Sequence, residues 1–157
     1  LGSLPKAYLS HVGAALLTHY WLGETMNISI YEEDLEKHEK GSPLHIEDGC
    51  FNVKRFNTSE STIEIDSIKK REYGFAPKDM DYNKVIAIWL CEYGVTGWDG
   101  VFDDEKELKY SKQTARQIFM NPAYYLSLNS LLLQHACDYN NYLHDEIEED
   151  VTAIKKN

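Results

Sequence analysis

The side chains best suited to metal or acid–base chemistry lie in the second half of the chain. His135 and Cys137 are close neighbours in the sequence, and His144 and Glu148 are spaced to share one face of a helix. A zinc site needs three or four convergent ligands, and one helix supplies at most two of them here. His135 also belongs to an apolar helical pattern, where a histidine packed in a core or an interface is the simpler interpretation.

Other motifs for chemistry are weak or missing. The segment DGVFDDEKEL, from Asp99 onward, resembles a calcium loop but has Val101 at an expected oxygen ligand and Asp104 at the expected glycine. There is no GxGxxG, Walker loop, GxSxG, HExxH or CxxC motif. We therefore expect a protein that is not an enzyme, with no catalytic residue, no cofactor and no metal.

Composition narrows the classes of partner. The formal net charge is −10, which disfavours direct binding to nucleic acid and favours solubility and basic partners. Simple solubility explains the acidity equally well. The three cysteines, Cys50, Cys91 and Cys137, are odd in number and widely spaced, so we expect reduced thiols rather than a disulfide framework.

A β-hairpin is predicted over residues 44–56. Asp48-Gly49 is a favoured two-residue turn, and it would pair Ile46 with Phe51 and Leu44 with Val53. These four apolar side chains then share one face of the hairpin. Because an isolated hairpin is only marginally stable, this face must pack on another element.

Helices are predicted for most of the remaining chain. Apolar spacing and capping residues indicate helices over about residues 58–73 and 79–93, a short one after Ser111, and a long one from Asn121-Pro122. The glycine-rich, acidic segment 94–110 is predicted as a loop. The last helix carries an apolar stripe, made of Tyr125, Leu128, Leu132, His135, Tyr139 and Tyr142. The expected fold is mainly α (α+β), a helical domain with a small N-terminal β-hairpin.

Residues 1–25 differ from the rest of the chain. They hold one Lys, one Glu and no Asp, and their apolar stretch is too short and too polar to span a bilayer. Gly23-Glu24-Thr25 can be encoded so that a ribosome-binding sequence precedes Met26. We therefore expect residues 1–25 to be a non-native or leader extension, and residues 26–157 to form a single domain with an acidic C-terminal helix end.

A series of short motifs resembles one protein family. Gly97-Trp98-Asp99-Gly100-Val101 is followed by the acidic run 103–105, then by Leu108-Lys109-Tyr110-Ser111, Ala115-Arg116 and Asn121-Pro122. Together with the earlier segment 49–57, their order over about residues 43–157 resembles the small tail assembly chaperones of long-tailed bacteriophages. Each motif is weak alone, and their common order carries the resemblance.

The resemblance implies a non-enzymatic assembly factor. Such a chaperone binds the tape measure protein of its phage, keeps it soluble and helps recruit tail tube subunits. It acts in the host bacterial cytoplasm during infection and is not expected in the mature virion. From the net charge and the short apolar stretch we expect no nucleic-acid partner and no membrane, and the sequence leaves self-association open.

Four residues are the candidates for partner contact. Leu128, Leu132 and Tyr139 belong to the last apolar stripe, and Trp98 lies in the predicted glycine-rich loop. Ordinary core packing is the competing interpretation for all four. Two other functions also stay open: an acidic phage-encoded module that binds or regulates a host protein, and a small enzyme using His135 and His144.

Overall fold

The computed structural model describes residues 28–75 and 78–145. The chain divides into two compact units, residues 1–30 and 31–157. A short 3-10 turn, η1, covers Ile28–Tyr31, and the other described elements belong to the second unit. The predicted extension 1–25, the predicted start at Met26 and the acidic end beyond Asp145 lie outside the described residues.

An antiparallel three-stranded sheet organises the second unit. Its strands are β1 (Ser42–Ile46), β2 (Gly49–Val53) and β3 (Val95–Asp99), in the order β1-β2-β3. A separate two-stranded ribbon pairs β4 (Phe102–Asp103) with β5 (Lys106–Glu107). The predicted mainly helical fold with a single hairpin is therefore wrong, and the fold is a mixed α+β arrangement.

The third strand lies in the segment that was predicted as a loop. β3 pairs with β2, so that Trp98 lies opposite Phe51 and Asp99 opposite Cys50. Gly94, Gly97 and Gly100 made this segment look like a loop, because glycine weakens an isolated strand. Pairing with a distant strand and burial of Val95 and Trp98 overcome that local weakness.

The predicted hairpin forms, but its register differs by two residues. The turn residues are Glu47 and Asp48, Ile46 pairs with Gly49, and Leu44 pairs with Phe51. Because side chains alternate with a period of two, this shift keeps the predicted apolar residues on one face. Gly49 is not needed for turn geometry. A Cβ at Gly49 would lie 3.2 Å from the carbonyl oxygen of Gly100, so close packing explains the glycine.

Most predicted helices are confirmed by their capping residues. Thr58 caps α3 (Ser59–Tyr73), Asp81 caps α4 (Tyr82–Trp89) and Ser111 caps α5 (Lys112–Phe119), each through a side-chain oxygen that accepts a backbone N–H. Asp34 caps the short helix α2 (Leu35–Lys40) in the same way. α4 continues into one wide π-helical turn, η2 (Leu90–Gly94), which ends at the predicted glycine.

The predicted long last helix is broken into three pieces. They are the 3-10 turn η3 (Pro122–Tyr124), the helix α6 (Leu128–Cys137) and the 3-10 turn η4 (Tyr139–Tyr142). Ser127 has φ −115° and ψ −95°, outside the helical region. Asp138 is extended, and its carboxylate accepts the backbone N–H of Asn140. The continuous apolar stripe predicted for this segment is therefore interrupted at both ends of α6.

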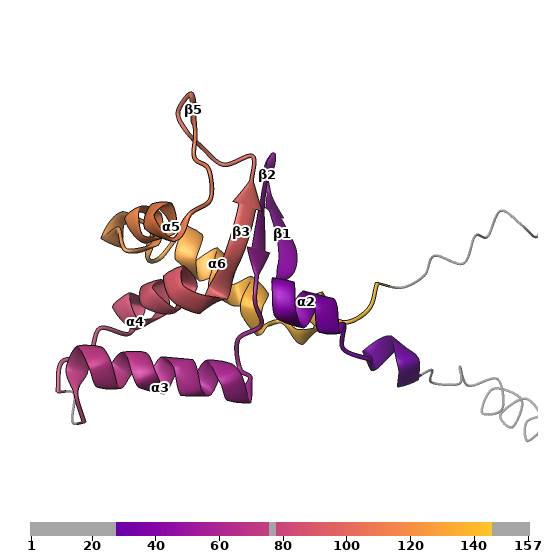
Figure 1. The fold of residues 1–157 in the computed structure, drawn as a ribbon, viewed down its shortest axis with the longest axis horizontal. Coiled ribbons are helices and arrows are strands. Elements are labelled where there is room, and N and C mark those ends of the chain that lie inside the picture. The colour runs from indigo at the N-terminus through magenta and orange to yellow at the C-terminus, as the bar shows by residue number, and fades with distance from the viewer. Residues whose placement is uncertain (1–27, 76–77, 146–157) are drawn as a thin grey trace, which may run out of the picture. The chain divides into compact units, whose positions relative to one another are not determined.

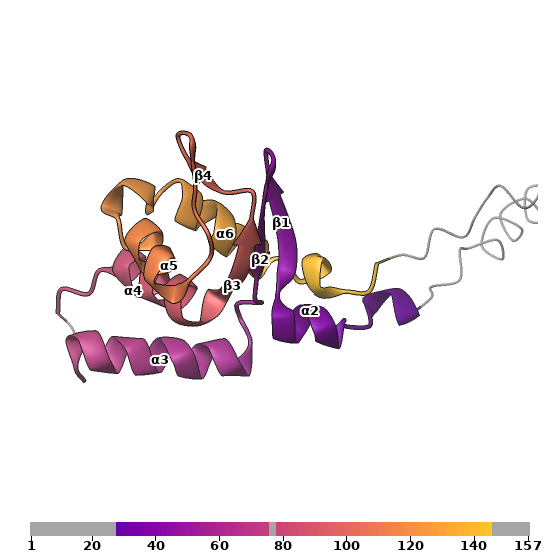
Figure 2. The same cartoon turned by 45° about the horizontal axis from the view of Figure 1, so that its top comes forward.

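One core joins the sheet to the helices. α6 contacts β2 on one face of the sheet, while α4 contacts α3, α5 and α6 (Figures 1 and 2). The hydroxyl of Tyr142 donates to the carbonyl of Val53 over 2.9 Å, which ties the end of the chain's last turn to the central strand. The largest fully buried apolar side chains are Trp89, Tyr142, Phe119, Ile68, Ile88, Leu90 and Leu132.

Candidate partner-binding surface

The four predicted contact residues have very different environments. Trp98 is only 5% exposed, and Leu132 is fully buried. The indole N–H of Trp98 donates to the carbonyl of Leu108, and its ring meets Tyr110 edge-on with centroids 4.9 Å apart. Leu128 is half-buried against the core, whereas Tyr139 is 47% exposed. Trp98 and Leu132 therefore act as core residues here, and Tyr139 alone is broadly accessible.

The outer face of α6 is the more informative surface. Its exposed side chains are uncharged, and they include Leu131 at 49% exposure. No Asp, Glu, Lys or Arg occurs from Gln117 to Cys137, although 27% of the whole chain is charged. The exposed positions of α6 are Ser130, Leu131, Gln134 and Cys137. Because water-facing helix surfaces are usually charged or strongly polar, this face is unusual.

Helix α3 provides the contrast within the same protein. Its inner residues, Ile65 and Ile68, are buried, as Leu132 and Ala136 are in α6. Its outer face carries Glu60, Asp66, Lys70 and Arg71 among the exposed positions. The one large apolar side chain there, Ile63, is 71% exposed among these charges. An exposed apolar residue on α3 is thus isolated, whereas Leu131 on α6 has uncharged neighbours.

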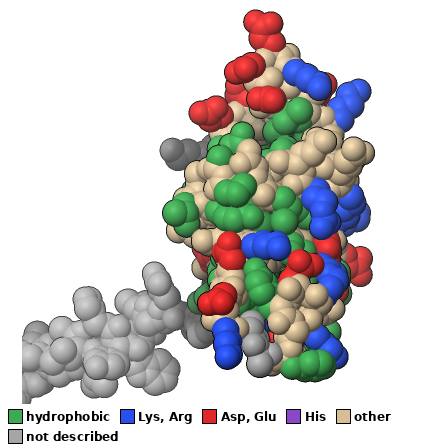
Figure 3. Space-filling view, turned by 90° about the vertical axis from the view of Figure 1, so that its left-hand side faces the viewer, with side chains coloured by type: hydrophobic (Ala, Val, Ile, Leu, Met, Phe, Trp, Pro, Cys, Tyr) green, Lys and Arg blue, Asp and Glu red, His purple; other side chains and the backbone are tan. Residues whose placement is uncertain are grey.

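Tyr124 and Leu126, just before α6, extend the uncharged character of the segment. Tyr124 is 40% exposed and Leu126 is 83% exposed. Asn121 holds the start of η3, because its side-chain oxygen accepts the backbone N–H of Ala123 over 3.0 Å. Figure 3 shows hydrophobic side chains gathered across the middle of one face of the molecule, below a group of acidic side chains.

A shallow hollow lies between α6 and the edge strand β1. Its volume is about 370 Å³, and Leu131 on α6 and Leu44 and Ile46 on β1 supply its apolar walls. We call it the α6–β1 groove. Its complete lining is Leu44, His45, Ile46, Leu131, Gln134, His135, Asp138 and Asn141. The groove continues the face of α6 onto the sheet, so a partner resting on α6 also reaches β1, and Asp138 is the one acidic residue in its lining.

His135 lies in the wall of this groove. Burial lowers the pKa of its imidazole, while a backbone hydrogen bond with Ser42 and the charge of Asp138 oppose that shift. Its Nε2 atom is buried and has no hydrogen-bond partner among the described residues. Burial therefore favours the neutral form of the side chain. The packed position agrees with the sequence prediction, but the unpartnered Nε2 differs from the fully hydrogen-bonded histidine that was expected.

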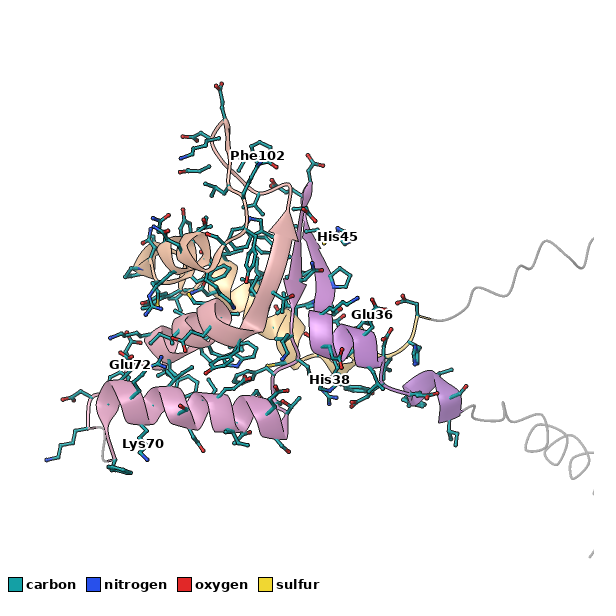
Figure 4. All side chains as sticks on the ribbon, viewed as in Figure 1. Glu36, His38, His45, Lys70, Glu72 and Phe102 are labelled. Atoms are coloured by element: carbon teal, nitrogen blue, oxygen red, sulfur yellow. The ribbon has the colours of Figure 1, made fainter. Side chains whose placement is uncertain are left out.

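A polar network that the sequence did not reveal joins the start of α5 to η2, and η2 to α3. The ammonium of Lys112 donates to the carbonyls of Cys91 and Glu92, which the wide turn η2 leaves open. Glu92 in turn receives the guanidinium of Arg71 over 2.9 Å. Figure 4 labels Glu72, whose carboxylate pairs with Lys84 and Arg71 between α3 and α4.

The candidate residues for chemistry do not assemble into a site in the described part of the chain. Cys91 is buried, and burial raises the pKa of its thiol to about 11, so it is a poor nucleophile at neutral pH. His144 lies 3.6 Å from Asp34, whereas its predicted companion Glu148 is outside the described residues. Across residues 28–75 and 78–145, no three His, Cys, Asp or Glu side chains are placed to hold a metal ion.

Comparison with protein-family models, curated proteins and solved structures finds no match for this chain. Among the helices that the structure describes, none combines the length and the apolar character needed to cross a membrane.

Sequence reasoning missed Leu131 and the walls contributed by β1. The helical stripe ran through Leu128 and Leu132, so it marked the buried side of α6. The missing charges between Gln117 and Cys137 were the signal that identifies the opposite face. The contribution of Leu44 was not readable in this way, because it depends on where the sheet meets α6.

Proposed function

We propose that this protein is a non-enzymatic phage tail assembly chaperone. In this proposal it covers an apolar stripe of the tape measure protein, keeps that protein soluble and helps recruit tail tube subunits. The order of motifs from Gly97 to Pro122 supports the class of protein. The uncharged, partly apolar outer face of α6 is the observation that supports a helix-binding role.

The physical argument rests on which surfaces can cover an apolar helical stripe. A long helical protein without its assembly partners exposes apolar side chains that would aggregate in water. A partner covers such a stripe best with an apolar groove, because charges there would be buried without a counter-charge. The outer face of α6 meets this requirement, and Leu44 and Ile46 of the α6–β1 groove extend its apolar surface, while Asp138 lies beyond the end of α6. The acidic remainder of the surface keeps the assembled complex dispersed.

The test is co-expression with the tape measure protein encoded by the neighbouring gene. The chain should co-purify with that protein and increase its soluble fraction. Leu131→Asp places a charge at the centre of the proposed contact and should reduce the binding constant at least tenfold, as expected for an interface hot spot. Because Leu131 is half-exposed, the variant should still fold.

Ile63→Asp is the matched control. It makes the same chemical change at an exposed position of α3, away from α6. This variant should bind and solubilise the tape measure protein as the unmodified chain does. If Ile63→Asp loses binding and Leu131→Asp keeps it, the outer face of α6 is not the contact surface. If the unmodified chain fails to bind and instead captures a host protein, the chaperone proposal is wrong.

A further inference from the structure

A second exposed apolar region lies at the end of the sheet, next to the α6–β1 groove, with which it shares Ile46. The β1–β2 turn and the turn after β3 meet there, and we call this region the tip. Gly100 has φ +66°, and a Cβ at that position would lie 2.7 Å from the carbonyl oxygen of Asp48. A Cβ at Gly49 would lie 3.2 Å from the carbonyl oxygen of Gly100, a less severe but still close approach. The backbones of the two turns are therefore in direct contact and set each other's position.

The tip encloses a hollow with an apolar lining. Ile46 and Phe51 come from the hairpin, and Val101 and Phe102 come from the segment after β3. The hollow has a volume of about 270 Å³, and Phe102 is 57% exposed. A backbone hydrogen bond of 2.8 Å from Leu108 to Val101 closes the base of the β4–β5 ribbon that carries Phe102. Figure 4 labels Phe102 on the β4–β5 ribbon, near the β1–β2 turn.

The charges around this hollow identify the kind of partner. The β1–β2 turn and the segment 99–107 contribute seven acidic side chains and one basic side chain, Lys106. Glu47 and Asp48 line the hollow itself, whereas Asp99 and Glu107 line a separate hollow beside Trp98. None of the seven forms an ion pair with another described residue, in contrast to Glu72 and Glu92 between the helices. The seven are Glu47, Asp48, Asp99, Asp103, Asp104, Glu105 and Glu107. Figure 3 shows several acidic side chains at this end of the molecule, with basic side chains beside them.

We propose that the tip hollow binds a basic segment of a partner protein, in which an apolar side chain is flanked by lysines or arginines. The apolar side chain rests against Phe102 and Ile46, and the flanking cations lie near Glu47, Asp48 and Asp103. Unpaired acids around an exposed aromatic ring give an apolar contact with a strong preference for positive charge.

Two simpler explanations for the acidic residues, solubility and metal binding, do not explain the apolar hollow beside them. Acids that serve solubility alone are expected to be interspersed with bases over the surface, and they need no apolar hollow at their centre. A bound metal ion would need at least three convergent ligands, and the part of the chain that the structure describes contains no such group.

Short labelled peptides test the proposal without any natural partner. The probe has a central Leu-Phe pair with two lysines on each side. One companion replaces the lysines by glutamates, and the other replaces Leu-Phe by Ser-Ser. Fluorescence anisotropy with the full chain should show binding of the probe at about 50 mM salt that weakens at about 300 mM. Each companion should bind at least about tenfold more weakly, because each lacks one of the two contacts.

Variants of the full chain locate the binding site. Phe102→Ser removes the exposed ring and should weaken probe binding about tenfold. Glu47→Gln combined with Asp103→Asn should weaken it about fivefold at low salt and little at high salt. All three positions are exposed, so these variants should fold.

Glu32→Gln combined with Glu39→Gln is the control for net charge. Both positions are exposed, and the pair removes the same total charge away from the tip. This variant should bind the probe as the unmodified chain does. Equal weakening by the control and the tip variants would overturn the proposal, since net charge alone would then attract the peptide. Binding of the glutamate companion as tightly as the probe would overturn it as well.

Discussion

The outer face of α6 and the tip both expose apolar side chains, but their charges differ completely. Leu131 belongs to a run without Asp, Glu, Lys or Arg, from Gln117 to Cys137, and Asp138 is the one acidic residue that lines its groove. The two segments that form the tip carry seven acidic side chains without ion pairs to other described residues, and two of them, Glu47 and Asp48, line the hollow with Phe102. An apolar partner is best covered by the first surface, whereas the second selects for positive charge. One small domain can thus offer two contacts of different chemistry.

The two regions are also held in different ways. α6 is fixed by side chains: Leu132 and Ala136 are fully buried, and the amide of Asn129 donates to the carbonyl of Phe119 over 2.8 Å. The tip is fixed mainly by backbone contact at Gly49 and Gly100. We therefore expect the α6 surface to respond to core substitutions and the tip to respond to any side chain added at its glycines.

The largest expected effect separates core from surface within α6. Leu132→Asp places a charge in the core and should lower the free energy of unfolding by about 4 kcal/mol or more. Leu131→Asp, at the next position, should change it by less than about 0.5 kcal/mol. Urea denaturation measures both values. If the two variants were equally destabilised, the outer face of α6 would be part of the core rather than a free surface.

The second prediction concerns the backbone contact at the tip. Gly100→Ala adds a Cβ that would lie 2.7 Å from the Asp48 carbonyl, at a residue with positive φ. It should lower the free energy of unfolding by about 2–3 kcal/mol. Gly97→Ala is the control, three residues earlier, in β3. There the nearest atom to the added Cβ, outside the chain neighbours, lies 3.7 Å away on the side chain of Asn52. That variant should be neutral or slightly more stable. Equal effects in thermal denaturation would show that the tip tolerates a side chain there.

Local signals in the sequence predicted much of the fold. Capping residues and apolar spacing located α3, α4 and α5, and the alternation in the hairpin identified its buried face. The hairpin register was wrong because Gly49 was read as a turn residue. Its actual neighbour, Gly100, lies in a distant turn that no local pattern reveals. The same limit explains why β3 was missed, since its pairing with β2 joins segments far apart in the chain.

The candidate site was predictable to a smaller extent. The stripe through Leu128 and Leu132 lies on the helix of the proposed surface but marked its buried side. Trp98 was placed in a loop, although β3 carries it into the core. The uncharged run around α6 was present in the sequence and would have identified Leu131. The tip hollow was not predictable, because it needs β2 and β3 to bring two turns together.

The third prediction uses the ionisable group in the α6–β1 groove. Burial lowers the pKa of His135 in the folded state, whereas the unfolded chain retains the ordinary value near 6.5. As pH falls below about 6.5 the unfolded state therefore takes up a proton that the folded state resists, and stability decreases. The slope from this one group cannot exceed about 1.4 kcal/mol per pH unit.

His135→Gln should reduce this dependence of stability between about pH 7 and about pH 5. Asp138 and the backbone of Ser42 are the groups that oppose the shift, and this variant leaves both in place. His45→Gln is the control, because His45 lines the same groove but is exposed on β1. Urea denaturation over this pH range measures the slope. An unchanged slope in His135→Gln would mean that the groove does not keep this imidazole neutral.

The smallest expected effect concerns how far the acidic residues of the tip lower the free energy of unfolding. Glu47 adopts φ +53°, a conformation that asparagine tolerates better than most side chains, and it carries one of the seven acidic charges. Glu47→Asn should therefore raise the free energy of unfolding by about 0.5–1 kcal/mol. Glu47→Gln removes the charge without improving the turn, so it should give a smaller gain that disappears at high salt.

Both Glu47 variants should nevertheless bind the lysine-flanked peptide more weakly. A gain in stability with a loss of binding would show that the tip retains an unfavourable residue for contact rather than for folding. Thermal denaturation and peptide anisotropy on the same samples measure the two effects together. If Glu47→Asn were more stable and bound equally well, Glu47 would have no role in partner contact, and the difference between the tip and the α6 face would rest on the other six acids and Phe102.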